Sequence, residues 1–271
     1  MTNYLLTFFI HLLLSTSCNG FCIGSQGKAI APETTSAERK DVKKFLDLVY
    51  GDEKSEEWEA RRIQARATGE DDQTLNISEE ELVYGELGLD ALATIMDAVG
   101  VQKGDHFMDI GSGDGLLVSG ASLLYSDYLE ESMGIEIVPE LFERSLKFER
   151  RLEEIVEQAN KEDAKNVSPS MSCFELGNVY EPSNRVSSMF SKTTLAVCFA
   201  TTWSNGIPGR KLARLSESLG LKGQCPLPSG ARLVIIDGVL DPEDGYDFVG
   251  QFKLYCPDTA PYSVARLYIR T

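Results

Sequence analysis

The sequence is poor in histidine and has no closely paired cysteines. Only two of its 271 residues are histidines, His11 and His106. A Ser-His-Asp or Cys-His catalytic system, or a site with several histidine ligands, would depend on His106 alone, and we discount these chemistries. The six cysteines include no Cys-x-x-Cys pair, so neither a zinc ribbon nor thioredoxin-type chemistry is indicated. We expect no metal site.

The chain also lacks an excess of basic residues. It has 26 Lys and Arg against 42 Asp and Glu, a formal net charge of −16. Nucleic-acid binding depends on clustered Lys and Arg that release counterions from the phosphates. We therefore expect no strong nucleic-acid surface. With 42% hydrophobic and 25% charged residues, the composition is that of a globular protein with a substantial core.

A long apolar run is missing as well. The most continuous one, Leu5 to Leu14, is too short for a stable membrane anchor, and small polar residues follow it up to Gly20. This pattern is typical of a secretory signal, so we predict a leader over residues 1–20 and no membrane span in the mature chain. The segment around Phe21 resembles the two-part plastid presequences of algae with secondary plastids, and plastid import is the alternative.

The region after the leader is predicted to be a linker and a helical extension, residues 21–77. Apolar residues at helical spacing, such as Val42, Phe45, Leu46 and Val49, lie in a highly charged segment and favour two helices between residues 37 and 68. The sequence Ser78-Glu79-Glu80-Glu81 then has the form of a capping box. We place the main folded domain at residues 78–271.

Apolar strand-like runs alternate with helical patterns from Glu86 onward, which predicts a doubly wound α/β sheet. The expected strands are 106–110, 132–137, 172–176, 195–200 and 231–236, followed by a terminal pair at 249–255 and 264–269. The expected helices are 87–99, 116–125, 139–159 and 209–219. The prediction is a seven-stranded sheet that ends in a C-terminal antiparallel hairpin.

The first strand of this domain ends in a glycine-rich turn, Gly111-Ser112-Gly113-Asp114-Gly115. Glycines there let a ligand approach the backbone closely, and amides at the start of the next helix are expected to be available to an anionic group. The spacing Gly-x-Gly-x-Gly differs from the dinucleotide motif Gly-x-Gly-x-x-Gly, so hydride transfer is the weaker interpretation. Glu136 follows at the carboxyl end of the next strand, where a carboxylate can accept both hydroxyls of an adenosine ribose.

These features resemble the class I methyltransferases that depend on S-adenosylmethionine, whose sheet is Rossmann-like. Within that class the likeness is to the non-SET histone-lysine methyltransferases, the disruptor-of-telomeric-silencing family, over about Val83 to Ile236. It is carried by three segments: Val83-Tyr84-Gly85-Glu86, Phe107-Met108-Asp109-Ile110-Gly111-Ser112-Gly113 and Gly134-Ile135-Glu136. The resemblance implies S-adenosyl-L-methionine as the cofactor.

The resemblance also implies roles for matching residues. Tyr84 and Glu86 would belong to a loop over the methionine end of the cofactor, the segment from Asp109 to Gly113 would cradle that end, and Glu136 would bind the ribose. The full set of predicted cofactor-binding residues is Tyr84, Glu86, Asp109, Gly111, Ser112, Gly113, Gly115, Glu136 and Asn178. Asp114 and Gly115 resemble instead a related mitochondrial protein-lysine methyltransferase family.

The acceptor side departs from the family pattern. The family's Gly-Asp-Phe segment appears as Gly177-Asn178-Val179, and its Asn-Asn-Phe-Ala-Phe loop is represented by residues 198–203 without either asparagine. Tyr84, Phe199 and Trp203 are the predicted catalytic residues, as aromatic walls that attract a cationic amine. The favoured function is a protein-lysine N-methyltransferase with a histone as the potential substrate, and a nuclear location if the leader is unused. The alternatives are a small-molecule or plastid-metabolite methyltransferase and a cofactor-binding module without turnover.

Overall fold

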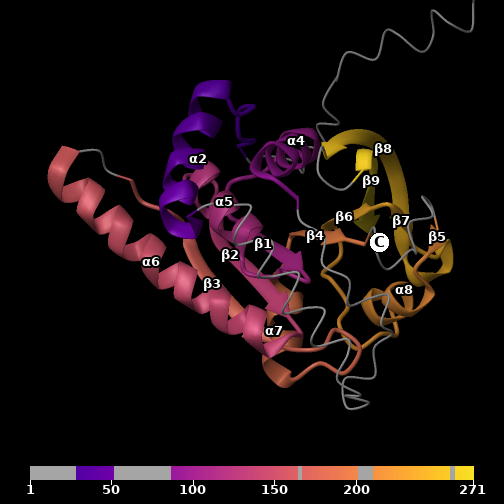
Figure 1. Ribbon diagram of the computed structural model, residues 1–271. Coiled ribbons are helices and arrows are strands. Elements are labelled where there is room, and N and C mark those ends of the chain that lie inside the picture. Colours follow the sequence, from indigo (N-terminus) through magenta and orange to yellow (C-terminus); the bar gives the residue numbers. More distant parts are fainter. Residues whose placement is uncertain (1–28, 52–86, 164–166, 201–209, 257–259) are drawn as a thin grey trace, which may run out of the picture.

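The computed structural model describes residues 29–51, 87–163, 167–200, 210–256 and 260–271. Their centre is a seven-stranded sheet with the strand order β3-β2-β1-β4-β6-β9-β8 (Figure 1). Its strands are β1 (Asp105–Ile110), β2 (Leu129–Glu136), β3 (Met171–Leu176), β4 (Leu195–Phe199), β6 (Arg232–Ile236), β8 (Tyr246–Cys256) and β9 (Ala260–Arg270). The predicted number of strands is confirmed.

Strand direction matches a doubly wound sheet with a terminal hairpin. β1 pairs in parallel with β2 and β4, β2 with β3, and β4 with β6. β9 runs antiparallel to both β6 and β8. The chain therefore winds outward from β1 in both directions, and the carboxyl ends of β1, β2, β4 and β6 meet at one edge of the sheet. Ligands of open α/β sheets bind at this edge.

Helices cover both faces because each helix has one apolar side. Against one face lie α4 (Leu89–Val99), α5 (Leu116–Leu124) and α6 (Pro139–Asp163), and against the other lie α7 (Asn184–Lys192) and α8 (Ala213–Leu219). In α4, Leu92, Ile95 and Met96 are fully buried against the sheet, as the helical spacing predicts. On the opposite face, Phe190 and Leu215 fill the same role.

The N-terminal extension contains α2 (Ser36–Tyr50), which confirms a helix in this part of the chain. A capping box between Thr35 and Glu38 fixes its start. At its end, the ring of Tyr50 lies 4.4 Å from that of Phe148 in α6, and its hydroxyl is 3.1 Å from the hydroxyl of Ser119 in α5. The second helix predicted between residues 37 and 68 lies mostly outside the described residues.

Strands β2, β8 and β9 begin three or four residues before their predicted starts, and two helices differ further from the prediction. The helix expected over 209–219 begins only at Ala213, because Arg210–Lys211 forms a short strand, β5, that pairs in parallel with β7 (Gly238–Val239). The helix α7 is absent from the predicted elements. Ser183 caps it by accepting a hydrogen bond from the amide of Val186, a signal that the sequence does contain.

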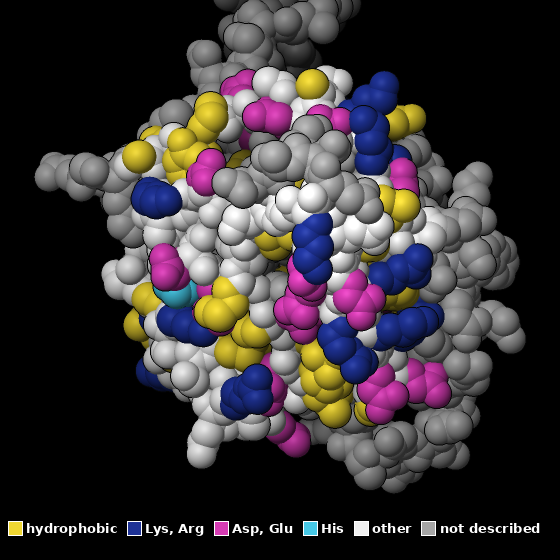
Figure 2. Space-filling model, turned by 90° about the vertical axis from the view of Figure 1, so that its left-hand side faces the viewer, with side chains coloured by type: hydrophobic (Ala, Val, Ile, Leu, Met, Phe, Trp, Pro, Cys, Tyr) yellow, Lys and Arg dark blue, Asp and Glu magenta, His cyan; other side chains and the backbone are white. Residues whose placement is uncertain are grey.

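The surface of the described residues carries charges of both signs. On the face in Figure 2, Lys and Arg side chains alternate with Asp and Glu, and the described residues form no continuous basic strip there. No helix in the described parts of the chain is both long and apolar enough to cross a membrane. The same residues contain no group of His, Cys, Asp and Glu side chains that could hold a metal ion.

Candidate functional site

The glycine-rich turn connects β1 to α5 at the carboxyl edge of the sheet. Its backbone is left-handed at three residues, with φ of +80° at Gly111, +56° at Gly113 and +93° at Gly115. Residues with a side chain rarely adopt this region. A Cβ atom at Gly115 would also lie 2.7 Å from the ring of Phe174. The turn therefore requires glycine for its own conformation.

The backbone N–H groups of this turn are engaged within the protein. Those of Gly111 and Ser112 donate to the carbonyl of Ile135 at 2.9 Å each, that of Gly113 donates to the carboxylate of Glu136 at 2.7 Å, and that of Gly115 donates to the carbonyl of Ser112 at 2.9 Å. These four turn amides are therefore unavailable to an anionic ligand, whereas the expectation of available amides concerned the start of α5, which begins at Leu116. The reason is tertiary, because the neighbouring strand β2 supplies most of the acceptors.

Glu136 lies at the carboxyl end of β2, as predicted, and is 5% exposed. Its Oε2 accepts the N–H of Gly113, and its Oε1 accepts those of Ile137 and Val138 at 2.8 Å each. Burial raises the pKa of Glu136 to about 7, although these three hydrogen bonds lower it. A carboxylate oxygen can accept two hydrogen bonds, so Oε2 retains the capacity for another donor.

Two further acids surround the turn. Asp109, in β1, is 3% exposed, and burial together with the nearby charge of Glu136 raises its pKa well above the ordinary range. Asp114 is also 3% exposed, and its Oδ2 lies 3.7 Å from Nη2 of Arg144 in α6. Three buried carboxyl groups thus face one turn, with a guanidinium at one side. A cationic ligand would favour the ionised forms of these carboxyl groups, whereas an anionic ligand would disfavour them.

Sequence reasoning missed the pairing of Asp114 with Arg144. Arg144 lies in a long helix rich in charged residues, where nothing in the sequence distinguishes it from its neighbours. Its guanidinium lies 5.2 Å from the ring centroid of Phe148, which belongs to the same helix and packs against α2. The pair is visible only once α6 is placed beside the turn.

The other predicted residues fall into two groups. Phe199 is the last residue of β4. Its neighbour Cys198 pairs with Ile110, the last residue of β1, so Phe199 lies beside Gly111 at the start of the glycine turn. Asn178 follows β3, and its side-chain oxygen accepts the N–H of Tyr180 at 2.8 Å. The structure brings both residues to the same edge as Glu136. Tyr84, Glu86 and Trp203 lie outside the described residues.

Asp237 is a second residue that sequence reasoning missed. It directly follows β6 at the same edge and has a φ of +62°, the one positive value among the described residues other than glycine. Its carboxylate accepts the N–H of Val264 at 2.7 Å, and its own N–H donates to the carbonyl of Val264 at 2.9 Å. An acid after a buried apolar strand is the same signal that identified Glu136, and it could have identified Asp237.

Comparison with known proteins gives one family match. The model of the family described as "Histone methylation protein DOT1" matches residues 75–166, which include the glycine turn and Glu136. No curated protein matches the chain.

Solved structures of low sequence identity are also similar. The rRNA methyltransferase aviRa from Streptomyces viridochromogenes has 13% identity and a TM-score of 0.48, with 74% of this chain and 93% of that chain covered. An RNA methyltransferase from Salinibacter ruber, crystallised with S-adenosyl-L-homocysteine, has 19% identity and a TM-score of 0.38, with 67% and 90% covered. The fold assignment follows from the strand order and pairing of the chain itself. The chain has the fold of the class I S-adenosylmethionine-dependent methyltransferases, and its residues 75–166 resemble the DOT1 histone methylation proteins.

Proposed function

We propose that this protein transfers a methyl group from S-adenosylmethionine to a lysine side chain of a protein, with a histone as the first substrate to test. The observation that carries the proposal is the set of three buried carboxyl groups, Asp109, Asp114 and Glu136, around a glycine turn at the switch point of the sheet. The DOT1 match over the same segment supports it.

The hydrogen bonds and the buried acids of the turn favour S-adenosylmethionine over a dinucleotide as the cofactor. A pyrophosphate is bound by backbone N–H groups at the start of a helix. Here the N–H groups of Gly111, Ser112 and Gly113, in the turn before α5, donate to β2 and do not serve a phosphate. Buried acids beside the turn would repel a pyrophosphate. They suit S-adenosylmethionine, which carries a sulfonium, an ammonium and two ribose hydroxyls and has no phosphate.

When bound, the cofactor supplies an electrophilic methyl group on a positively charged sulfur. In the transfer that it would supply, a nitrogen–carbon bond would form as the carbon–sulfur bond breaks, the electron pair of that bond would go to sulfur, and the amine would afterwards lose a proton to water. Glu136 would orient the ribose by accepting its hydroxyl protons, and Asp109 would hold the ammonium. The chain therefore acts by positioning and by excluding water, and a neutral amine requires no strong base.

Phe199 is the described residue that is placed to contact the acceptor. It ends β4, is partly buried, and lies at the carboxyl edge between β1 and β6. An aromatic face there would attract an amine that carries a positive charge before or after transfer. With a net charge of −16, a basic protein segment is a better acceptor than a polyanionic nucleic acid.

The test is a transfer assay with the full chain, labelled S-adenosylmethionine and two acceptor pools, core histones and small molecules from a cell extract. Label on lysine, located by mass spectrometry and absent with the Glu136→Ala variant, supports the proposal. Label confined to small molecules contradicts the lysine acceptor. Cofactor binding without label in either pool contradicts turnover and leaves a binding module.

We propose further that residues 1–20 form a cleaved secretory leader and that residues 78–271 form the catalytic domain. The apolar run Leu5 to Leu14 supports the first statement, and the start of the DOT1 match at residue 75 supports the second. Sequencing the amino terminus of the protein from its native cell checks the leader. A mature chain that begins at residue 1 contradicts it.

A further inference from the structure

Glu136 is held between the start of α6 and the glycine turn. The two residues that separate it from Pro139, the first residue of α6, are Ile137 and Val138, and they donate their N–H groups to its Oε1 at 2.8 Å each. The other carboxylate oxygen, Oε2, accepts the N–H of Gly113 at 2.7 Å. The orientation of this carboxylate therefore depends on how α6 and the turn are placed relative to each other.

A second set of contacts joins α6 directly to the turn. Arg144 lies in the second turn of α6, and its Nη2 is 3.7 Å from Oδ2 of Asp114 in the glycine turn. The next residue, Ser145, is fully buried, and a Cβ atom at Gly115 would lie 3.2 Å from its Cβ. The side chains of Arg144 and Asp114 are only 16% and 4% exposed, so water and salt screen their attraction little. The contacts of α6 therefore run from Glu136 through the turn and back to the helix.

The charge of Asp114 needs a partner at this place. Burial raises the pKa of Glu136 most, and the charge of Asp114 raises it as well, which shows that the two carboxyl groups act on each other. The guanidinium of Arg144 lies beside Asp114 and offsets its charge. Without that partner, repulsion would push Asp114 from its place. Gly113, directly before it, would move too, and the N–H bond to Glu136 would weaken.

We infer that Arg144 is a positioning residue for the ribose of the cofactor: it anchors Asp114 and thereby keeps the carboxylate of Glu136 aimed at the ribose hydroxyls. The inference rests on the proposed cofactor and on Glu136 as its ribose ligand. Arg144 acts here through the turn and not by touching the cofactor, as supporting residues behind a ligand commonly do. Its effect is therefore specific to the contact with the ribose hydroxyls.

The experiment compares the affinities of the full chain for S-adenosylhomocysteine and for its 2′-deoxy analogue, which lacks one ribose hydroxyl. The ratio of the two affinities measures the contact with Glu136 and cancels effects that weaken both ligands alike. We expect a ratio of about ten in the wild-type chain, as for a hydrogen bond to a charged group, and close to one in Glu136→Ala. Arg144→Gln should lower the ratio to about three. Arg144→Lys keeps the positive charge and should retain most of the ratio.

Two further variants separate this role from general effects. Arg144→Gln leaves the carboxylate of Asp114 buried without its guanidinium, so adding Asp114→Asn in a double variant should restore part of the ratio. A double variant with no better ratio than Arg144→Gln contradicts the role. Arg150→Gln removes an exposed arginine of the same helix and should leave the ratio as in the wild type.

Failure of the inference is distinguishable from failure of the proposed function. Methyl transfer plays no part in the measurement, so a negative transfer assay leaves the expected ratios unchanged. If the wild-type chain binds neither ligand, or binds both equally, the proposed cofactor site is wrong and the inference is overturned with it. If the wild-type chain and Glu136→Ala behave as expected but Arg144→Gln keeps the full ratio, only the role of Arg144 is overturned. The same holds if Arg144→Gln and Arg150→Gln lower the ratio equally.

Discussion

The two halves of the sheet differ in the segments that connect their strands. In the half that holds β1, β2 and β3, a glycine turn and the long helix α6 come after the first two strands and enclose buried acids. In the half that holds β6, β8 and β9, a short connection comes after β6 and leaves an aromatic cavity. The comparison teaches that one continuous sheet can carry a tightly bonded polar turn in one half and a cavity beside a hairpin in the other. The difference arises from the connecting segments.

The halves are joined by a buried ion pair. Arg232, at the start of β6, donates to the carboxylate of Asp105 at the start of β1 and to the carbonyl of Gly100 after α4. Both side chains are almost fully buried, with 5% and 2% exposed. This contact lies at the edge opposite the glycine turn, so it can be broken without touching the cofactor residues.

The largest expected effect separates stability from binding. Arg232→Ala leaves the carboxylate of Asp105 buried without its guanidinium, and we expect the free energy of unfolding to fall by about 3–5 kcal/mol in urea titration. Affinity for S-adenosylhomocysteine should stay unchanged in the folded protein. As a control, Lys161→Ala breaks a pair with Glu157 that is 69% exposed on both sides, and it should cost less than about 0.5 kcal/mol. Equal losses in the two variants would contradict the prediction.

The next effect tests the backbone of the turn. Gly113→Val places a β-branched residue at a φ of +56° and disturbs the N–H bond to Glu136, so we expect cofactor affinity to fall by about a hundredfold or more. Calorimetric titration with S-adenosylmethionine measures it. Gly104→Val is the matched control, because Gly104 has a φ of +82°, a Cβ atom added there would meet nothing within 4 Å, and it precedes β1 at the opposite edge. If both variants lose affinity alike, the effect is general strain.

A smaller effect tests the ribose ligand. Glu136→Ala should weaken cofactor binding by about 1–3 kcal/mol, the usual contribution of hydrogen bonds to a charged group. Glu131→Ala is the control, since both acids lie in β2 and both are 5% exposed, but Glu131 faces Lys192 toward the amino end of the strand. The control should lower stability and leave cofactor affinity intact. Unchanged affinity in Glu136→Ala would refute the assignment.

The smallest effect concerns pH. Because the pKa of Glu136 is raised to about 7 and ribose hydroxyls bind the ionised form, cofactor affinity should increase with pH below 7, by up to about tenfold per unit, and level off above it. Asp109, Asp114 and Arg144 face the same turn and contribute to its charge. In Glu136→Ala the slope should become shallower. The raised pKa also affects stability. Between about pH 4.5 and 7 the folded protein keeps the Glu136 proton that the unfolded chain has lost, so the free energy of unfolding falls as pH rises through this range.

Much of the fold was predictable because its signals are local. The apolar run before Gly111, the glycine spacing and the acid after the next run predict strand, turn and ribose ligand, and the structure places these residues at one edge of the sheet. Hydrophobic spacing likewise predicted α4 and α5 to within two residues at each end. These features depend on residues close together in the chain, where side-chain pattern and backbone preference act directly.

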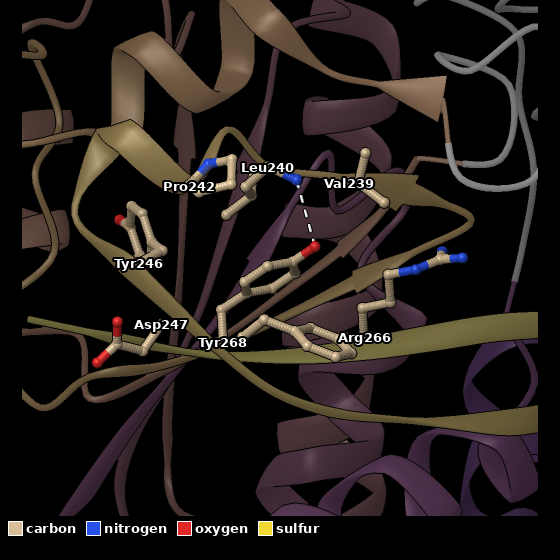
Figure 3. A pocket seen from close by; sticks show the side chains of 8 residues that line it. Val239, Leu240, Pro242, Tyr246, Asp247, Arg266 and Tyr268 are labelled. Carbon is tan, nitrogen blue, oxygen red and sulfur yellow. Dashed lines mark hydrogen bonds between the residues drawn. The ribbon is translucent and has the colours of Figure 1, made fainter.

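The sequence by itself determined the sheet, the glycine turn, and the position of Glu136 at the carboxyl end of β2. Only the tertiary structure decided that the turn amides donate to β2, that Arg144 pairs with Asp114, and that the segment between β6 and β8 leaves a cavity beside the hairpin (Figure 3). Each of these contacts joins residues from different elements. Their distance depends on how helices and strands pack, which no local pattern specifies.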